Sequence, residues 1–86
     1  MPYIKKADRD RIDSIFNVTE QTLPQTCGEL NYLFTKIILK YLEYKGESYQ
    51  TYNDIIGALE CCKQELYRRK IVSYENNKCK LNGEVF

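Results

Sequence analysis

Aromatic and arginine side chains gather in one stretch of the chain, between residues 48 and 75. A flat ring can stack on a nucleobase and a guanidinium fork can clamp a phosphate, so this combination suits a small anionic or nucleotide-like ligand. The same residue types also make an ordinary solvent-exposed helix surface. With one more tyrosine from an earlier segment, the candidate ligand-binding residues are Tyr32, Tyr49, Asn53, Glu60, Arg68 and Arg69.

The charged residues in this stretch can also be explained without a ligand. Glu65 and Arg69 are four residues apart, a spacing that on a helix favours a surface ion pair. The basic run from Arg68 to Lys70 is either a solvated face or the best local basic site. Because Arg68 and Arg69 would point about 100° apart on a helix, we expect one molecule to offer only one of them to a given pocket.

Catalytic and metal chemistry have little support in the sequence. Asp54, Glu60 and Glu65 offer carboxylates for acid–base work, but no nucleophile, metal set or glycine-rich phosphate loop accompanies them. The four cysteines, at 27, 61, 62 and 79, form no C-x-x-C motif, and the chain has no histidine. Cys61 and Cys62 would point about 100° apart on a helix. We therefore expect a non-enzymatic protein with free thiols that act as small hydrophobic side chains, and with no metal or cofactor; a metal site or a disulfide is the alternative.

Length and charge limit the remaining classes. A chain of 86 residues forms a single domain, 1–86, and a domain of this size buries only about 60% of its unfolded surface. The net charge of +1 does not favour nonspecific binding to nucleic acid or to an anionic membrane. The longest apolar runs fall short of the roughly 18 residues of a membrane span, and the first residues lack the apolar stretch of a secretion signal. We expect a cytoplasmic protein.

The sequence predicts an all-α fold that positions these candidate residues. Its three helices are expected over residues 8–17, 27–45 and 51–75. The second helix follows the capping pattern Thr26-x-x-Glu29 and stops before Gly46, and apolar residues recur between them at spacings of three and four. Its short connection to the third helix predicts that the two form an antiparallel hairpin.

The third helix carries the longest apolar pattern, formed by Ile55, Ile56, Leu59, Cys62, Leu66 and Tyr67. This spacing predicts a face buried in the core. Thr51 is expected to cap the first turn with support from Asp54, so the helix should begin near Tyr52. Gly57 indicates close approach of another backbone or, alternatively, of a ligand.

Other apolar residues fall outside the faces that three helices can bury: Leu39, Tyr44, Ile71 and Val72. A second apolar surface on so small a chain favours a homo-oligomer. Alternatively, the polar tail after Tyr74 turns at Asn82-Gly83 and brings Val85 and Phe86 back onto the domain.

Several strings carry a resemblance that covers nearly the whole chain: YIKKADRDRID, GELNY from Gly28, SYQTYNDIIGALEC from Ser48, ELYRR from Glu65, YE at Tyr74 and NGEV near the end. On these strings the chain resembles a family of short uncharacterised proteins of bacteriophages and bacteria. Where family members tend to have a proline shortly before the YE pair, this chain has Val72-Ser73-Tyr74, which leaves the end of the third helix open. The shared strings are rich in polar and aromatic residues, which favours a functional site.

Two functions follow as hypotheses from the same aromatic and arginine cluster. In the first, a phage-type binding protein takes up a small anionic or nucleotide-like molecule between the second and third helices, and so sequesters a host defence signal. In the second, the chain is a protein–protein interaction module that docks on a host or phage protein through its tyrosines and apolar surface. A phage-encoded chain would act in the host cytoplasm. The residues alone do not separate the two hypotheses.

Overall fold

A computed structural model describes residues 4–16 and 20–85. The chain divides into two units, Met1–Tyr44 and Lys45–Phe86. The described residues of both units form helices and contain no strand, which confirms the all-α class. The single-domain organisation of residues 1–86 stays a prediction.

The first unit begins with helix α1, Lys6–Asp13, which continues as the 3-10 helix η1, Ser14–Phe16. The first helix therefore begins two residues before its predicted start at residue 8, and it changes to a 3-10 helix at Ser14. The Ser14 hydroxyl donates to the carbonyl of Arg11 over 2.6 Å. Its expected last residue, 17, lies outside the described residues. A second 3-10 helix, η2, covers Glu20–Thr22.

Helix α2, Cys27–Lys45, has the predicted bounds. The backbone N–H of Glu29 donates to the Thr26 hydroxyl oxygen over 3.1 Å, as the capping pattern predicts. The Glu29 carboxylate accepts from the N–H of Gln25, one residue earlier than in a reciprocal capping box. At the other end Gly46 has a φ of 86°, which ends the helix as expected.

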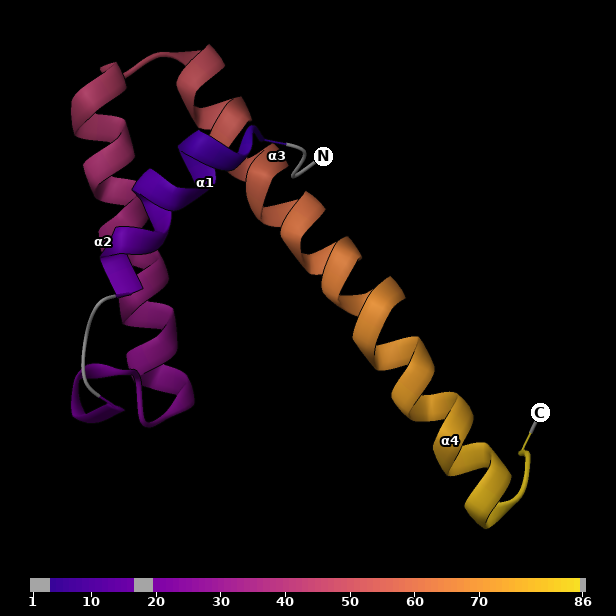
Figure 1. The fold of residues 1–86 in the computed structure, drawn as a ribbon. Helices are drawn as coiled ribbons and strands as arrows, with labels where there is room; N and C mark the ends of the chain where they lie inside the picture. The colour runs from indigo at the N-terminus through magenta and orange to yellow at the C-terminus, as the bar shows by residue number, and fades with distance from the viewer. Residues whose placement is uncertain (1–3, 17–19, 86) are drawn as a thin grey trace. The chain divides into compact units, whose positions relative to one another are not determined.

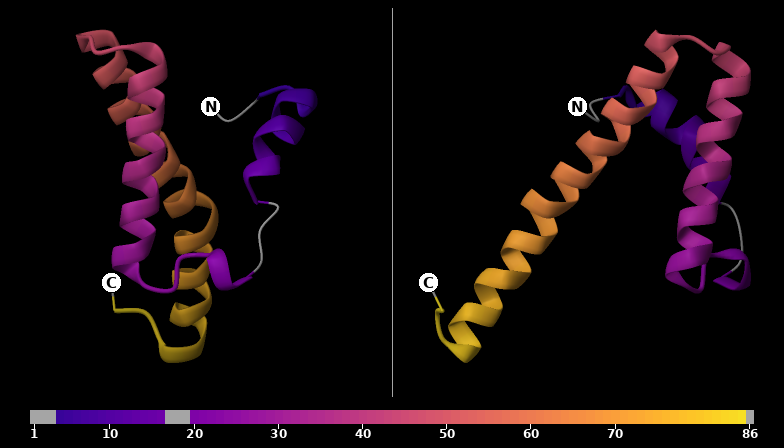
Figure 2. Two further views of the ribbon diagram at one scale, coloured as in Figure 1. Left: turned by 90° about the vertical axis from the view of Figure 1, so that its left-hand side faces the viewer. Right: turned by 180° about the vertical axis from the view of Figure 1, so that it is seen from behind.

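The second unit is one long helix (Figures 1 and 2). Helix α3, Tyr49–Leu66, the π-helical turn η3, Tyr67–Ile71, and helix α4, Val72–Asn82, have 18, 5 and 11 residues and follow one another without a break. We call these 34 residues the long helix; they span about 50 Å at 1.5 Å per residue. The long helix provides the frame for most of the candidate site residues.

The predicted start of this helix was wrong. Ser48, not Thr51, is its N-cap, and the Ser48 hydroxyl oxygen accepts from the backbone N–H of Thr51 over 3.1 Å. Thr51 instead lies inside the first turn, only 7% exposed, with its hydroxyl 3.0 Å from that of Ser48. The error arose because two hydroxyl residues three positions apart both fit a capping pattern.

The predicted end of the long helix near residue 75 was also wrong, since the helix continues to Asn82. Gly83, with a φ of 92°, ends it and donates its N–H to the carbonyl of Cys79 over 2.8 Å. Asn82-Gly83 is therefore a helix stop of the kind that glycine favours. Val85 is 90% exposed, so the predicted burial of the tail is not found at this residue; Phe86 lies outside the described residues.

Burial differs most from the sequence-based expectation. Among the described residues only Ile55 and Thr51 are buried, at 8% and 7% exposure. Leu59, Leu66 and Tyr67, which were expected in the core, are exposed. The physical reason is that the second unit contains a single helix, and a helix cannot cover its own apolar face.

Two glycines provide a matched test of these helices. A Cβ at Gly57 would meet nothing within 4 Å among the described residues, so the predicted close approach of another backbone is not found there. We expect Gly57→Ala to raise the free energy of unfolding by about 0.5–1 kcal/mol through helix propensity. Gly46→Ala should lower it by about 1 kcal/mol, because alanine is strained at positive φ.

Chemical denaturation of the two variants beside the parent chain measures both effects. A destabilising Gly57→Ala would show that a second backbone does approach this position, as the sequence had indicated.

Candidate functional site

The π-helical turn is the most unusual local feature of the long helix. The N–H of Val72 donates to the carbonyl of Tyr67, five residues back, whereas the N–H of Tyr67 still donates to Lys63, four residues back. A π-turn accommodates one additional residue in the helix and is often found at functional sites. Here it contains Arg68 and Arg69, two of the predicted site residues.

Both arginines bind the same carboxylate. Arg68 Nη2 lies 2.6 Å from Glu65 Oε1, and Arg69 Nε lies 2.7 Å from Glu65 Oε2. The predicted Glu65–Arg69 pair is thus confirmed, and Arg68 binds the same carboxylate. The expectation that one molecule offers only one of the two arginines to a given pocket stays a prediction. Spacings of three and four residues both reach the Glu65 side chain. An anionic ligand at this turn would compete with Glu65 for both guanidinium groups.

The same arrangement fixes the charge of Glu65. The hydrogen bonds from Arg68 and then from Arg69 lower the pKa of Glu65 to about 2, from an ordinary value of 4.5. The carboxylate side chain is 28% exposed, and the two arginine side chains are 63% and 58% exposed. Glu65 is therefore ionised throughout the physiological range, and the cluster keeps one net positive charge.

This pKa shift predicts a pH dependence of stability. A carboxyl group with a lowered folded-state pKa contributes stability above its unfolded pKa and loses it as the pH falls through the folded pKa. The Glu65 contribution should be complete above pH 4.5 and should disappear towards about pH 2. Thermal melts of the parent chain and of Glu65→Gln should differ by a constant amount above pH 4.5 and converge near pH 2. A difference that closes near pH 4.5 would contradict the double ion pair.

The predicted ligand-binding residues lie at several levels of the long helix. Tyr49, which is 90% exposed, and Asn53 are one turn apart in its first two turns. Asn53 and Arg68 are 15 residues apart, which is about 22 Å along the axis. Glu60 lies between them and accepts from Gln64 Nε2 over 2.9 Å. The structure therefore brings Arg68 and Arg69 together but does not join them to Asn53 within one helix.

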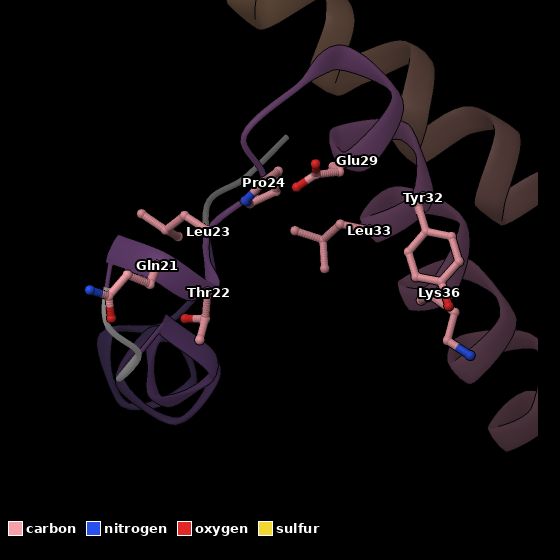
Figure 3. A pocket seen from close by; sticks show the side chains of 8 residues that line it. All are labelled: Gln21, Thr22, Leu23, Pro24, Glu29, Tyr32, Leu33 and Lys36. Carbon is pink, nitrogen blue, oxygen red and sulfur yellow. The ribbon is translucent and has the colours of Figure 1, made fainter.

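Tyr32 belongs to the first unit and lines a cavity of about 310 Å³ (Figure 3). The cavity lies between the η2 segment and the first turns of α2, where Leu33 points towards Leu23. The ammonium group of Lys36 lies 5.9 Å from the centre of the Tyr32 ring, a cation–π distance. Tyr32 is thus a predicted site residue that lies at a cavity.

A second tyrosine interaction lies at the start of the long helix. The Tyr52 hydroxyl donates to Glu47 Oε2 over 2.5 Å, and this hydrogen bond raises the pKa of Tyr52 above its ordinary value of 10. The bond links the second turn of α3 to the segment before it. Tyr52 is therefore held in place although its side chain is 41% exposed.

Sequence reasoning missed a seven-residue repeat on the long helix. We call its members the apolar stripe: Tyr52, Leu59, Leu66, Tyr74 and Leu81. Each step is seven residues except the step from Leu66 to Tyr74, which is eight, and the π-turn lies inside this step. In a regular helix an eighth residue would be rotated by about 80° from the first. The additional residue of the π-turn removes that rotation and keeps the stripe on one side.

All five members of the apolar stripe are exposed, with exposed fractions between 40% and 77%. Ile55, the buried residue, lies beside Tyr52 and Leu59 on the same side of the helix. On the other side, Gln64 and Asn76 lie about 140–160° from the neighbouring stripe residues and Asn53 lies about 100–120° from them, and near Asn76 this side also contains Val72 and Cys79. Helix α3 is thus amphipathic, whereas the apolar residues of α4 do not gather on one side.

The cysteines are more accessible than expected. Cys27, Cys61 and Cys62 are exposed free thiols, and Cys79 is half-buried. Within residues 4–16 and 20–85 no group of three or more His, Cys, Asp or Glu residues has the arrangement of a metal site. None of the helices in the described ranges is both long and apolar enough to span a membrane.

The comparison with known proteins identifies a family. A family model described as a domain of unknown function, DUF6899, matches residues 1–85. No match to the chain was found among curated proteins or among solved structures. The match spans nearly every residue of both units, and the chain therefore belongs to the DUF6899 family.

Proposed function

We propose that the chain is a non-enzymatic protein-interaction module that docks the apolar stripe of its long helix on another protein chain. The observation that carries the proposal is the alignment of five exposed apolar residues across the π-turn. Exposed apolar surface of this extent is typical of interaction sites, because it costs free energy in water. An amphipathic helix presenting anchors at such spacings is a common recognition element.

The proposal includes two finer points of architecture. The connection of residues 46–48 between α2 and α3 favours an antiparallel hairpin of these two helices. Leu39, Tyr44 and Val72, which are 51%, 83% and 39% exposed, favour an oligomer. If the chain is phage-encoded, as its resemblance implies, the partner is a host or phage protein in the host cytoplasm.

Photo-cross-linking tests the docking surface. Benzoylphenylalanine is placed at Leu66 or Tyr74 on the stripe, and at Gln64 or Asn76 as matched controls. Each control lies two residues away and about 160° around the helix, at nearly the same level. We expect covalent adducts, identified by mass spectrometry, from the two stripe positions only. Equal adducts from both sides, or no adduct from the stripe, would contradict the proposal.

A small anionic ligand is the second candidate, and the cavity at Tyr32 supports it. The cavity volume of about 310 Å³ is at the lower end of ligand pockets. The Tyr32 ring can stack on a nucleobase, and the Lys36 ammonium group can neutralise a phosphate. In this form of the proposal the host defence signal is sequestered at the Tyr32 cavity, because Glu65 already occupies the two arginines.

Calorimetry against mono-, di- and cyclic nucleotides tests this candidate. Tyr32→Ala and Lys36→Ala should each weaken binding at least about tenfold, which corresponds to the loss of one stacking or charge contact. Arg68→Ala and Arg69→Ala serve as controls and should leave binding unchanged. Binding that survives Tyr32→Ala but not Arg68→Ala would move the site to the π-turn, and no heat with any nucleotide would remove the candidate.

A further inference from the structure

We infer that the partner of the apolar stripe is a second copy of the long helix, which runs antiparallel to the first with the two-fold axis near Leu66. This inference rests on the proposed function, because it names the partner of the same surface. Two independent features of the long helix support it: the symmetry of its apolar spacing and the asymmetry of its charge.

The apolar spacing is nearly the same in both directions from Leu66. Leu59 and Tyr74 lie seven and eight residues from it, and Tyr52 and Leu81 lie 14 and 15 residues from it. The additional residue on the second side is the one that the π-turn absorbs. A reversed copy of the helix therefore presents its stripe at the same levels as the original. This self-complementarity is what an interface around a two-fold axis requires.

The pairing at each level is also suitable in size. An antiparallel copy sets Tyr52 beside the partner's Leu81 and Leu59 beside the partner's Tyr74. Each of these levels combines one tyrosine ring with one leucine, so the combined side-chain volume is the same at both levels on either side of the centre. The two copies of Leu66 meet at the centre. Equal volumes at the flanking levels, with two smaller leucines at the centre, suit close packing of two helices around a two-fold axis.

The charge of the long helix selects the antiparallel orientation. Its first half, Tyr49–Leu66, has three carboxylates and one lysine, a net charge of −2. Its second half, residues 67–82, has five basic residues and one glutamate, a net charge of +4. A parallel pair would set the two basic halves side by side, whereas an antiparallel pair sets each basic half beside an acidic half. The interaction between the two helix dipoles also favours the antiparallel orientation.

Chemical cross-linking distinguishes the orientations. In a chain whose four native cysteines are replaced by alanine or serine, single cysteines are introduced as Leu66→Cys, Leu81→Cys and Tyr52→Cys, and a short bismaleimide is added. An antiparallel pair brings the two copies of position 66 together but holds the two copies of position 81 about 45 Å apart. Leu66→Cys should therefore cross-link with itself, and Leu81→Cys should cross-link only when it is mixed with Tyr52→Cys.

The outcomes separate this inference from the proposed function. Self-cross-linking of Leu81→Cys would show a parallel pair and overturn the antiparallel arrangement. A monomer by light scattering, with no cross-link from any variant, would overturn self-pairing. The benzoylphenylalanine adducts at Tyr74 then decide the proposed function: an adduct with a different protein leaves it standing, and the absence of any adduct removes it. Circular dichroism of each variant confirms that the helix is intact.

Discussion

Insertion of one alanine between Val72 and Ser73 should abolish docking through the second half of the apolar stripe, whereas deletion of Lys70 should preserve it. The insertion rotates Tyr74 and Leu81 by about 100° relative to Leu66. The deletion shortens the eight-residue step to seven, so that a regular α-helix keeps the stripe aligned without a π-turn. Removing two apolar anchors of about 1.5–3 kcal/mol each should reduce the adduct yield from Tyr74 at least about tenfold.

The control for the insertion and the deletion is a third variant, in which one alanine is inserted between Asn82 and Gly83, after the last member of the stripe. It changes the length of the chain but not the alignment, and we expect the yield of the parent chain. Helical content measured by circular dichroism should be similar in all three variants. Equal yields from the insertion between Val72 and Ser73 and from the deletion would show that alignment of the stripe does not matter.

Replacement of Ile55 with alanine should have the largest effect on stability. Ile55 is the only buried apolar residue among the described residues, at 8% exposure, and its neighbour Ile56 is 65% exposed. We expect Ile55→Ala to lower the free energy of unfolding by about 2–5 kcal/mol, because it leaves a cavity and loses buried surface. Ile56→Ala makes the same chemical change one residue away and should cost less than about 1 kcal/mol.

Chemical denaturation monitored by circular dichroism measures the free energy of unfolding of both variants. The total stability of so short a chain is modest, so Ile55→Ala should leave a substantial fraction of the chain unfolded at room temperature. Equal effects of the two substitutions would contradict the burial of the side of the helix that contains Ile55.

Local signals predicted the parts of the fold that local chemistry decides. Helix α2 has its predicted bounds because Thr26 caps it and Gly46 ends it, and neither residue depends on a distant contact. The start of α3 was misplaced because Ser48 and Thr51 both offer a capping hydroxyl. The end of the long helix was placed too early because the polar residues after Tyr74 lack an apolar pattern, although they contain no glycine or proline before Gly83.

Tertiary burial and the candidate site were less accessible to sequence reasoning. Apolar periodicity shows which side of a helix avoids water, but it does not show whether a covering element exists, and the second unit contains none. The π-turn could have been predicted, since the eight-residue step from Leu66 to Tyr74 interrupts a repeat of seven. The shared bonding of Arg68 and Arg69 to Glu65 depends on side-chain conformations that spacing alone does not determine.

The most direct test of a continuous long helix is a distance between two spin labels. Asn53→Cys and Asn76→Cys, in the cysteine-free chain diluted with unlabelled protein, place both labels away from the apolar stripe. One continuous helix separates the two backbone positions by about 34 Å. Pulsed electron paramagnetic resonance should therefore give a single narrow distribution near that value, allowing for the length of the labels. A broad distribution, or a distance below about 25 Å, would show that the helix ends or bends at the π-turn and would contradict a continuous apolar stripe.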